Sequence, residues 1–186
     1  MLGWHVSGAF DPGRPFPTVQ TNSPHEIHDA YLIFLRTHQL AHRALLSALP
    51  SGHWVSGMLG SGLMRLDADL LRLRVAPAPR PMVGLLHPLR PLGVAYAICG
   101  SQFSKALQRR HWAPLTKTDL PPGADNYLHD EAVAAGWKRC LAEIEDLADP
   151  IRDLQKLGED ADRTLALFHD CLASVKRNST QLLAAA

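Results

Sequence analysis

The stretch from Pro91 to Trp112, PLGVAYAICGSQFSKALQRRHW, decides the class of fold. It opens with a proline, and its apolar residues then recur at steps of three and four, at Ala95, Ile98, Cys99, Phe103, Ala106 and Leu107. This is the period of a helix with one face toward a core. Gly100 falls inside that helix, where a glycine costs about 1 kcal/mol relative to alanine. We therefore expect a helix over 91–112 whose backbone closely approaches another group at Gly100.

Two helical segments are expected on the N-terminal side of this stretch. Ser23-Pro24-His25-Glu26 has the pattern of a capping box, so the first helix should begin at Ser23 and run to about Leu49. A second segment should cover 53–74, with leucines along one face of its second half. The many prolines between Val75 and Pro91 exclude a regular helix there, so these residues form a connector.

Two more helices are expected on the C-terminal side. Asp125 or Asn126 is a suitable cap for a helix that runs to about Leu147. Asp149-Pro150 repeats the pattern of a cap followed by proline, and the last helix should end near Lys176, with an apolar stripe that begins at Ile151. The sequence thus predicts an all-α, single-domain bundle over 23–177, with an irregular arm at 1–22 and a frayed tail at 178–186.

Composition places the chain among ordinary globular proteins. Its 186 residues are 46% hydrophobic and 20% charged, and a net charge of +1 gives no footprint for nucleic acid. The three cysteines are far apart and match no metal spacing, which is typical of reduced, buried thiols in an intracellular protein. No apolar run approaches the ~20 residues of a membrane span, and the N-terminus lacks the pattern of a signal peptide. A cytoplasmic protein is expected.

His38 and His42 stand out among the ten histidines because they are four residues apart and share a helix face beside the apolar stripe. No glutamate follows as in the His-Glu-x-x-His pattern, and no acidic cluster offers a third ligand, so a zinc site is not expected. From spacing alone, two interpretations of such a histidine stay open. It either packs in the core or binds a ligand.

Several short motifs follow one another in a characteristic order. They are Leu35-Arg36-Thr37 with His42-Arg43-Ala44-Leu45, then Leu92–Ser101, then Gly136-Trp137-Lys138, and last Ala166-Leu167-Phe168. In this order and spacing, residues 30–176 resemble the bacterial biliverdin-producing heme oxygenases, as a divergent member. The strongest match is the segment from Tyr96 to Ser101 in its place relative to His42 and Trp137. The resemblance implies a heme-oxygenase-like helical bundle with a shortened middle region.

Carried over onto this sequence, the resemblance implies that His42 ligates the heme iron. It implies that Gly100 and Ser101 lie against the distal face of the porphyrin, and that Phe168 completes the pocket from the last helix. Arg36, close to His42 on the same helix, either meets the heme propionates or is a solvated charge. Heme would then be cleaved to biliverdin with release of iron and carbon monoxide, and a separate reductase would supply the electrons.

One departure from the family's pattern leaves two functions open. The second pair of distal glycines corresponds to Ser104 and Lys105, whose side chains alter the surface above the heme; Lys105 would swing out to a propionate or occupy the pocket. The first hypothesis is an active heme oxygenase, with Gly100, Ser101 and Ser104 on its distal helix. The second is a non-catalytic member that binds a tetrapyrrole or a protein partner as a regulatory module.

Overall fold

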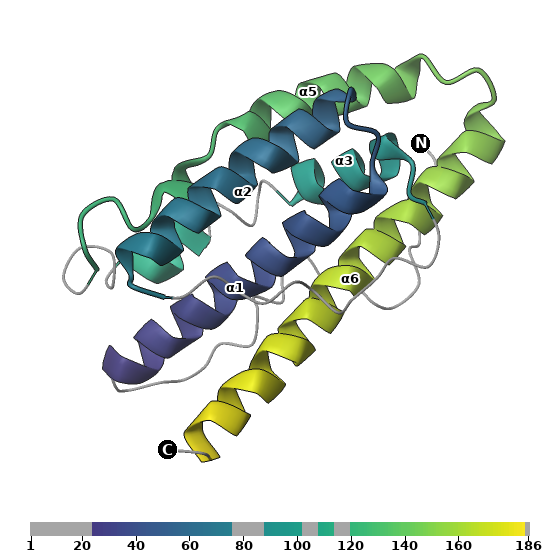
Figure 1. Ribbon diagram of the computed structural model, residues 1–186. Coiled ribbons are helices and arrows are strands. Elements are labelled where there is room, and N and C mark those ends of the chain that lie inside the picture. Colours follow the sequence, from purple (N-terminus) through teal and green to yellow (C-terminus); the bar gives the residue numbers. More distant parts are fainter. Residues whose placement is uncertain (1–23, 76–87, 102–107, 114–119, 185–186) are drawn as a thin grey trace.

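The computed structural model describes residues 24–75, 88–101, 108–113 and 120–184, and within them it contains helices and no strand (Figure 1). The predicted all-α, single-domain fold is confirmed. The elements are α1 (Pro24–Ala48), α2 (Trp54–Arg72), α3 (Pro91–Gly100), the short 3₁₀ helix η1 (Asn126–His129), α5 (Ala132–Glu145) and α6 (Pro150–Ala184). Residues 108–113 are also helical. The predicted N-terminal arm, the Ser23 cap and most of the proline-rich connector lie outside the described residues.

The helices pack as a bundle in which α1 contacts α2 and α6, while α3 contacts α5 and α6. Figure 1 shows α1 running between α2 and the long α6, with α2 and α6 both antiparallel to it. The helix α2 also contacts α5, α3 and η1, so it joins the two sides of the bundle. Among the described residues, no helix combines the length and the apolar character needed to cross a membrane.

One predicted cap is confirmed, and a further cap is seen at the start of α2. α6 begins at Pro150 as predicted, and the Asp149 carboxylate accepts a hydrogen bond from the Arg152 N–H, 3.3 Å away. At the start of α2, the His53 ring nitrogen Nδ1 accepts from the Val55 N–H at 3.3 Å. These side chains satisfy N–H groups that have no partner within the helix.

Two groups of buried residues form the interior. We call the larger one the aliphatic core; it lies between α1, α2, α3, α5 and α6 and includes Leu45, Leu59, Val94, Ile98, Cys99, Cys140, Leu167 and Cys171. We call the smaller one the aromatic end; it joins α1, α2, η1 and the 108–113 segment and consists of Tyr31, Phe34, Leu35, Leu66, Leu70, Trp112, Tyr127 and Leu128. Along α1 and just after it, the apolar stripe expected beside the two histidines is buried, at Tyr31, Phe34, Leu35, Ala41, Leu45 and Leu49.

Close helix crossings depend on glycine at two points. A Cβ at Gly93 of α3 would lie 2.5 Å from the Cβ of Asp160 and 3.1 Å from the Leu157 carbonyl of α6. A Cβ at Gly136 of α5 would lie 2.9 Å from the sulfur of Cys99 and 3.0 Å from that of Met58. Contacts of this length require the neighbours to move, so these glycines set the distance between helices.

The structure corrects the expected helix over 91–112. α3 ends at Gly100, and the Ser101 hydroxyl donates to the Ile98 carbonyl at 2.6 Å, one turn back. Glycine and serine both weaken helix continuation, because glycine is flexible and serine bonds to nearby backbone. Gly100 is therefore the last residue of a helix and not an interior one. Ser104 and Lys105 lie outside the described residues.

Three further expectations are corrected. Asn126 opens the short η1, and α5 begins only at Ala132, because the Asp130 carboxylate accepts from the Ala132 N–H at 3.0 Å and starts a new helix. The helix α6 runs past the predicted end near Lys176, to Ala184. Ile151, expected on its apolar stripe, is 87% exposed because the first turn of α6 projects beyond its neighbours.

Candidate functional site

His42 lies near the middle of the buried face of α1 and is only 3% exposed. Its Nδ1 atom is 3.1 Å from the backbone carbonyl oxygen of Leu59 on α2. Because a carbonyl oxygen can only accept, Nδ1 must carry the proton and donate. In the neutral ring the other nitrogen, Nε2, is then the acceptor. The packing of α1 on α2 thus determines the tautomer of His42.

Tyr127 of η1 links this histidine to His38, one turn earlier on α1. Its hydroxyl oxygen is 3.3 Å from Nε2 of His42 and 2.8 Å from Nδ1 of His38. A hydroxyl has one hydrogen, and Tyr127 donates it to Nε2 of His42. Nδ1 of His38 must therefore donate to the tyrosine oxygen. We call these three side chains the histidine–tyrosine cluster.

Aromatic rings and a glycine enclose the cluster. The Phe168 ring of α6 lies 5.1 Å from the His38 ring and 6.4 Å from the His42 ring, centre to centre. The Phe34 ring is 4.4 Å from that of His38. On the α2 side, a Cβ at Gly62 would lie 2.8 Å from Cε1 of His42, so only glycine leaves room for the imidazole. The His42 ring is held by contacts on both sides.

Asp69 of α2 holds the tyrosine in place. Its carboxylate is fully buried and accepts from the backbone N–H of Tyr127 at 2.8 Å, and from the backbone N–H and side-chain amide of Asn126 at 3.1 and 3.0 Å. Burial raises the pKa of Asp69 above its usual range, although these hydrogen bonds oppose the shift. Burial, with a smaller effect of the Asp130 carboxylate, also raises the pKa of Tyr127, so its hydroxyl stays protonated and available as a donor.

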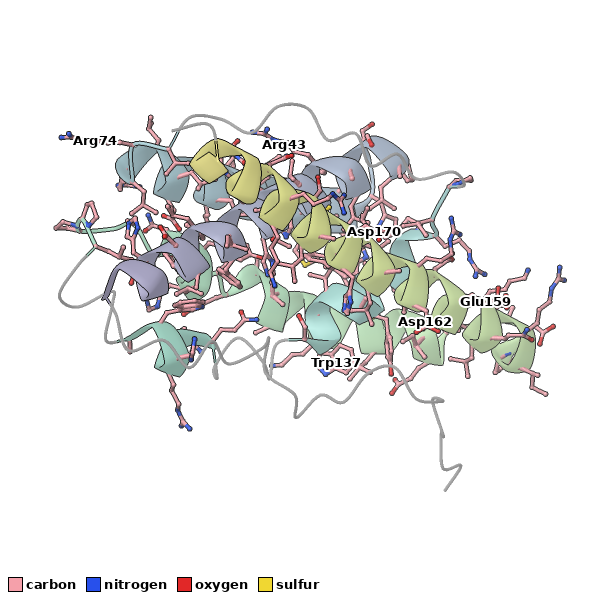
Figure 2. The ribbon with its side chains drawn as sticks, turned by 90° about the horizontal axis from the view of Figure 1, so that it is seen from below. Arg43, Arg74, Trp137, Glu159, Asp162 and Asp170 are labelled. Atoms are coloured by element: carbon pink, nitrogen blue, oxygen red, sulfur yellow. The ribbon has the colours of Figure 1, made fainter. Side chains whose placement is uncertain are left out.

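The structure brings together some of the predicted site residues and separates others. His42 and Phe168 do meet, as described above. Arg36 is half-buried and donates to the Gln39 side chain at 3.4 Å, while burial, with help from Arg43, lowers its pKa. Gly100 was expected against the face of a porphyrin. Its neighbour is the Trp137 ring of α5, which would lie 3.7 Å from a Cβ at this position. In Figure 2, Trp137 lies at the bottom of the view, whereas Arg43, the residue after His42, lies at the top. The Ser101 hydroxyl bonds to its own helix.

Nε2 of His42 is a suitable ligand atom for heme iron, but there is no space for the heme beside it. A histidine that binds a metal usually donates its second ring N–H to a carbonyl or carboxylate, and Nδ1 of His42 does so. A metal–imidazole bond is about 2 Å long. The Tyr127 hydroxyl, 3.3 Å from Nε2, stands where the iron and the porphyrin around it would lie. Heme therefore does not fit at His42 while Tyr127 keeps this position.

Within the described part of the chain, no group of three or more histidine, cysteine, aspartate or glutamate side chains is arranged to hold a metal ion. The three cysteines are buried and form no disulfide. Burial raises the pKa of Cys140 and of Cys171 to about 11, so both thiols are unreactive near neutral pH.

The sequence analysis missed two important residues of the site. Tyr127 follows a loop and has no periodic neighbours, so nothing in the sequence connects it with a histidine 85 positions away. Asp69 does leave a trace, since it stands between Leu66 and Leu70 in the buried half of α2. An acid at such a position predicts a specific buried partner, because an unpaired buried carboxylate is too costly.

The fold and site together define an all-helical bundle with a buried histidine–tyrosine cluster. In comparisons with known proteins, no family model, no curated protein and no solved structure matches the chain. The resemblance to the heme oxygenases stays a prediction.

Proposed function

We propose that this protein is a non-catalytic binding module, the second of the two functions left open by the sequence, and that its histidine–tyrosine cluster is structural. The observation that carries the proposal is that the protein itself engages both ring nitrogens of His42, Nδ1 through Leu59 and Nε2 through Tyr127. The cluster connects α1, α2 and η1 through directed bonds. Both ring nitrogens of His42 and the Tyr127 hydroxyl have partners in the cluster, and buried polar groups satisfied in this way fix a packing of helices.

A specific observation favours heme ligation as a second candidate. The Leu59 carbonyl gives His42 the tautomer and the ring orientation that a metal ligand needs. Heme, when bound, supplies the oxygen chemistry of a heme oxygenase. The chain would contribute the orientation of His42 and the apolar contact of Phe168, and Tyr127 would have to leave Nε2. The three hydrogen bonds by which Asp69 holds the η1 backbone and Asn126 oppose this movement of Tyr127.

A hemin titration followed by the Soret band separates the two candidates. The proteins compared are the wild type, His42→Ala, Tyr127→Phe and, as a control on the same helix, His28→Ala. We expect no saturable Soret shift that depends on His42 in any of them. Tyr127→Phe is the most demanding test, because it removes the hydroxyl that occupies Nε2.

A saturable shift that is lost in His42→Ala but kept in His28→Ala would overturn the proposal. So would a His42-dependent shift that the wild type already shows and that tightens in Tyr127→Phe. Circular dichroism checks that each variant is folded. The loss of the Tyr127 hydroxyl removes two buried hydrogen bonds, which should lower the free energy of unfolding by about 2 kcal/mol and leave the protein folded.

A further inference from the structure

A cavity of about 630 Å³ lies beside the start of α5. Its walls come from three elements: Leu128 of η1, Val133 and Ala134 of α5, and Arg109 of the 108–113 helical segment. Pockets for small organic molecules have volumes of roughly 300–1,000 Å³ and combine apolar walls with a few polar groups. The cavity falls within this range of sizes, and it is open to solvent on the side of its exposed residues Arg109, Ala134 and Lys138. His42 is not among its lining residues.

The charges around the cavity are not balanced. Asp130 is 7% exposed, and its carboxylate is already engaged, at 3.7 Å from the Arg65 guanidinium and 3.0 Å from the Ala132 N–H. Arg109 and Lys138 both line the cavity, and neither forms an ion pair with a residue that the structure describes. Glu131, which is exposed, is the one other acid at the wall. Two cations thus face one unengaged carboxylate.

We propose that this cavity binds a small organic carboxylate with an apolar body. Arg109 and Lys138, from different elements, attract the carboxylate, and the wall of Leu128, Val133 and Ala134 contacts the apolar part. The assignment rests on the proposed function, since it names the class of ligand that the binding module takes. Asp130 lines the cavity and also lies near the cluster, since a Cβ at Gly62 would lie 2.8 Å from Cε1 of His42 and 3.6 Å from the Asp130 carboxylate.

The test uses 2-naphthoate as the ligand and 2-naphthamide as its uncharged analogue, with binding measured by calorimetry on the full chain. We expect saturable binding of naphthoate that weakens as salt is added, and at least fivefold weaker binding of the amide, on the order expected for exposed charges. Arg109→Gln and Lys138→Gln should each weaken naphthoate binding about fivefold. Arg110→Gln, an exposed arginine outside the lining residues, should leave it unchanged.

A fourth variant tests the cavity itself. Ala134 is exposed on α5, so Ala134→Phe should fold normally, place a ring in the cavity and abolish binding of naphthoate. Equal affinity for naphthoate and naphthamide, an equal loss in Arg110→Gln, or undiminished binding in Ala134→Phe would each overturn the assignment, as would no binding by the wild type. None of these outcomes involves heme or His42, so the assignment can fail while the proposed role of the cluster stands.

Discussion

The aliphatic core and the aromatic end hold the same bundle together in different ways. In the aliphatic core, helices approach at Gly93 and Gly136, and the core residues themselves make apolar, undirected contacts; the directed bond beside Gly93 is the Arg90–Asp160 ion pair at 2.7 Å. In the aromatic end, buried polar groups have named partners: Asp69 holds η1, and Tyr31 donates to the Ala124 carbonyl at 3.0 Å. Apolar contacts can be exchanged when the volume is kept, whereas a lost acceptor leaves a buried donor unpaired. The two regions should therefore fail under different substitutions.

The largest effect should come from removing the acceptor that holds η1. Asp69→Ala leaves the buried N–H of Tyr127 and the backbone N–H of Asn126 without their acceptor, while the Asn126 amide keeps the Gly123 carbonyl. An unsatisfied buried donor costs about 1–3 kcal/mol, so the free energy of unfolding measured in urea should fall by about 4 kcal/mol. Asp162→Ala, on the exposed face of α6 labelled in Figure 2, should change it by less than about 0.5 kcal/mol. Similar small effects in both variants would contradict directed bonding as the basis of the aromatic end.

The aliphatic core should instead respond to added volume at one helix crossing. Gly93→Ala pushes a methyl group toward the Leu157 carbonyl and the Asp160 side chain, and should lower the free energy of unfolding by about 2 kcal/mol. The matched control is Gly60→Ala on α2, where a Cβ would meet nothing within 4 Å. Since alanine is the better helix former, this variant should gain up to about 1 kcal/mol. Thermal unfolding should thus shift in opposite directions, and a shift of the same sign in both would refute the close crossing.

The smallest expected effect is a loss of stability at alkaline pH that comes from two buried thiols of the aliphatic core. Cys140 and Cys171 belong to the aliphatic core, and burial raises the pKa of each thiol to about 11. Between pH 8 and 9.5 both thiols ionise in the unfolded chain and stay protonated in the folded one. The unfolded state then binds fewer protons, so stability falls as pH rises, by about 1 kcal/mol per thiol.

One variant tests whether the Cys140 thiol contributes to this pH dependence of stability. Urea unfolding at pH 8 and at pH 9.5 should show a smaller loss of stability for Cys140→Ala than for the wild type, whatever the variant's stability at pH 8. The comparison uses the difference between the two pH values, so the small cavity left by the alanine cancels. An identical loss in both proteins would show that the Cys140 thiol ionises as easily when folded as when unfolded.

The sequence predicts the helices and their buried faces well because these depend on local period and on caps. The α1 stripe and the start of α6 are examples, and so is the shared face of His38 and His42, whose rings lie 6.5 Å apart. The end of α3 was not predicted, because a period of three to four continues through Gly100 while the Ser101 hydroxyl ends the helix. Non-local partners were also missed.

Gly62 illustrates that second failure. Its sequence neighbourhood contains Gly57 and Gly60 as well, and all three have the same local effect of weakening a helix. Only in three dimensions do they differ: a Cβ at Gly57 or Gly60 would enter open space, while one at Gly62 would collide with His42. Which glycine is required is decided by another helix, and the spacing along the chain does not contain that information.

The single hydrogen on the Tyr127 hydroxyl has one more consequence. The bonds from His38 through Tyr127 and His42 to the Leu59 carbonyl all point the same way, because the carbonyl fixes the last donor and each donor fixes the one before it. The three side chains therefore share one orientational degree of freedom. They must reorient together or not at all, and substitutions at any two of them should have effects that do not add.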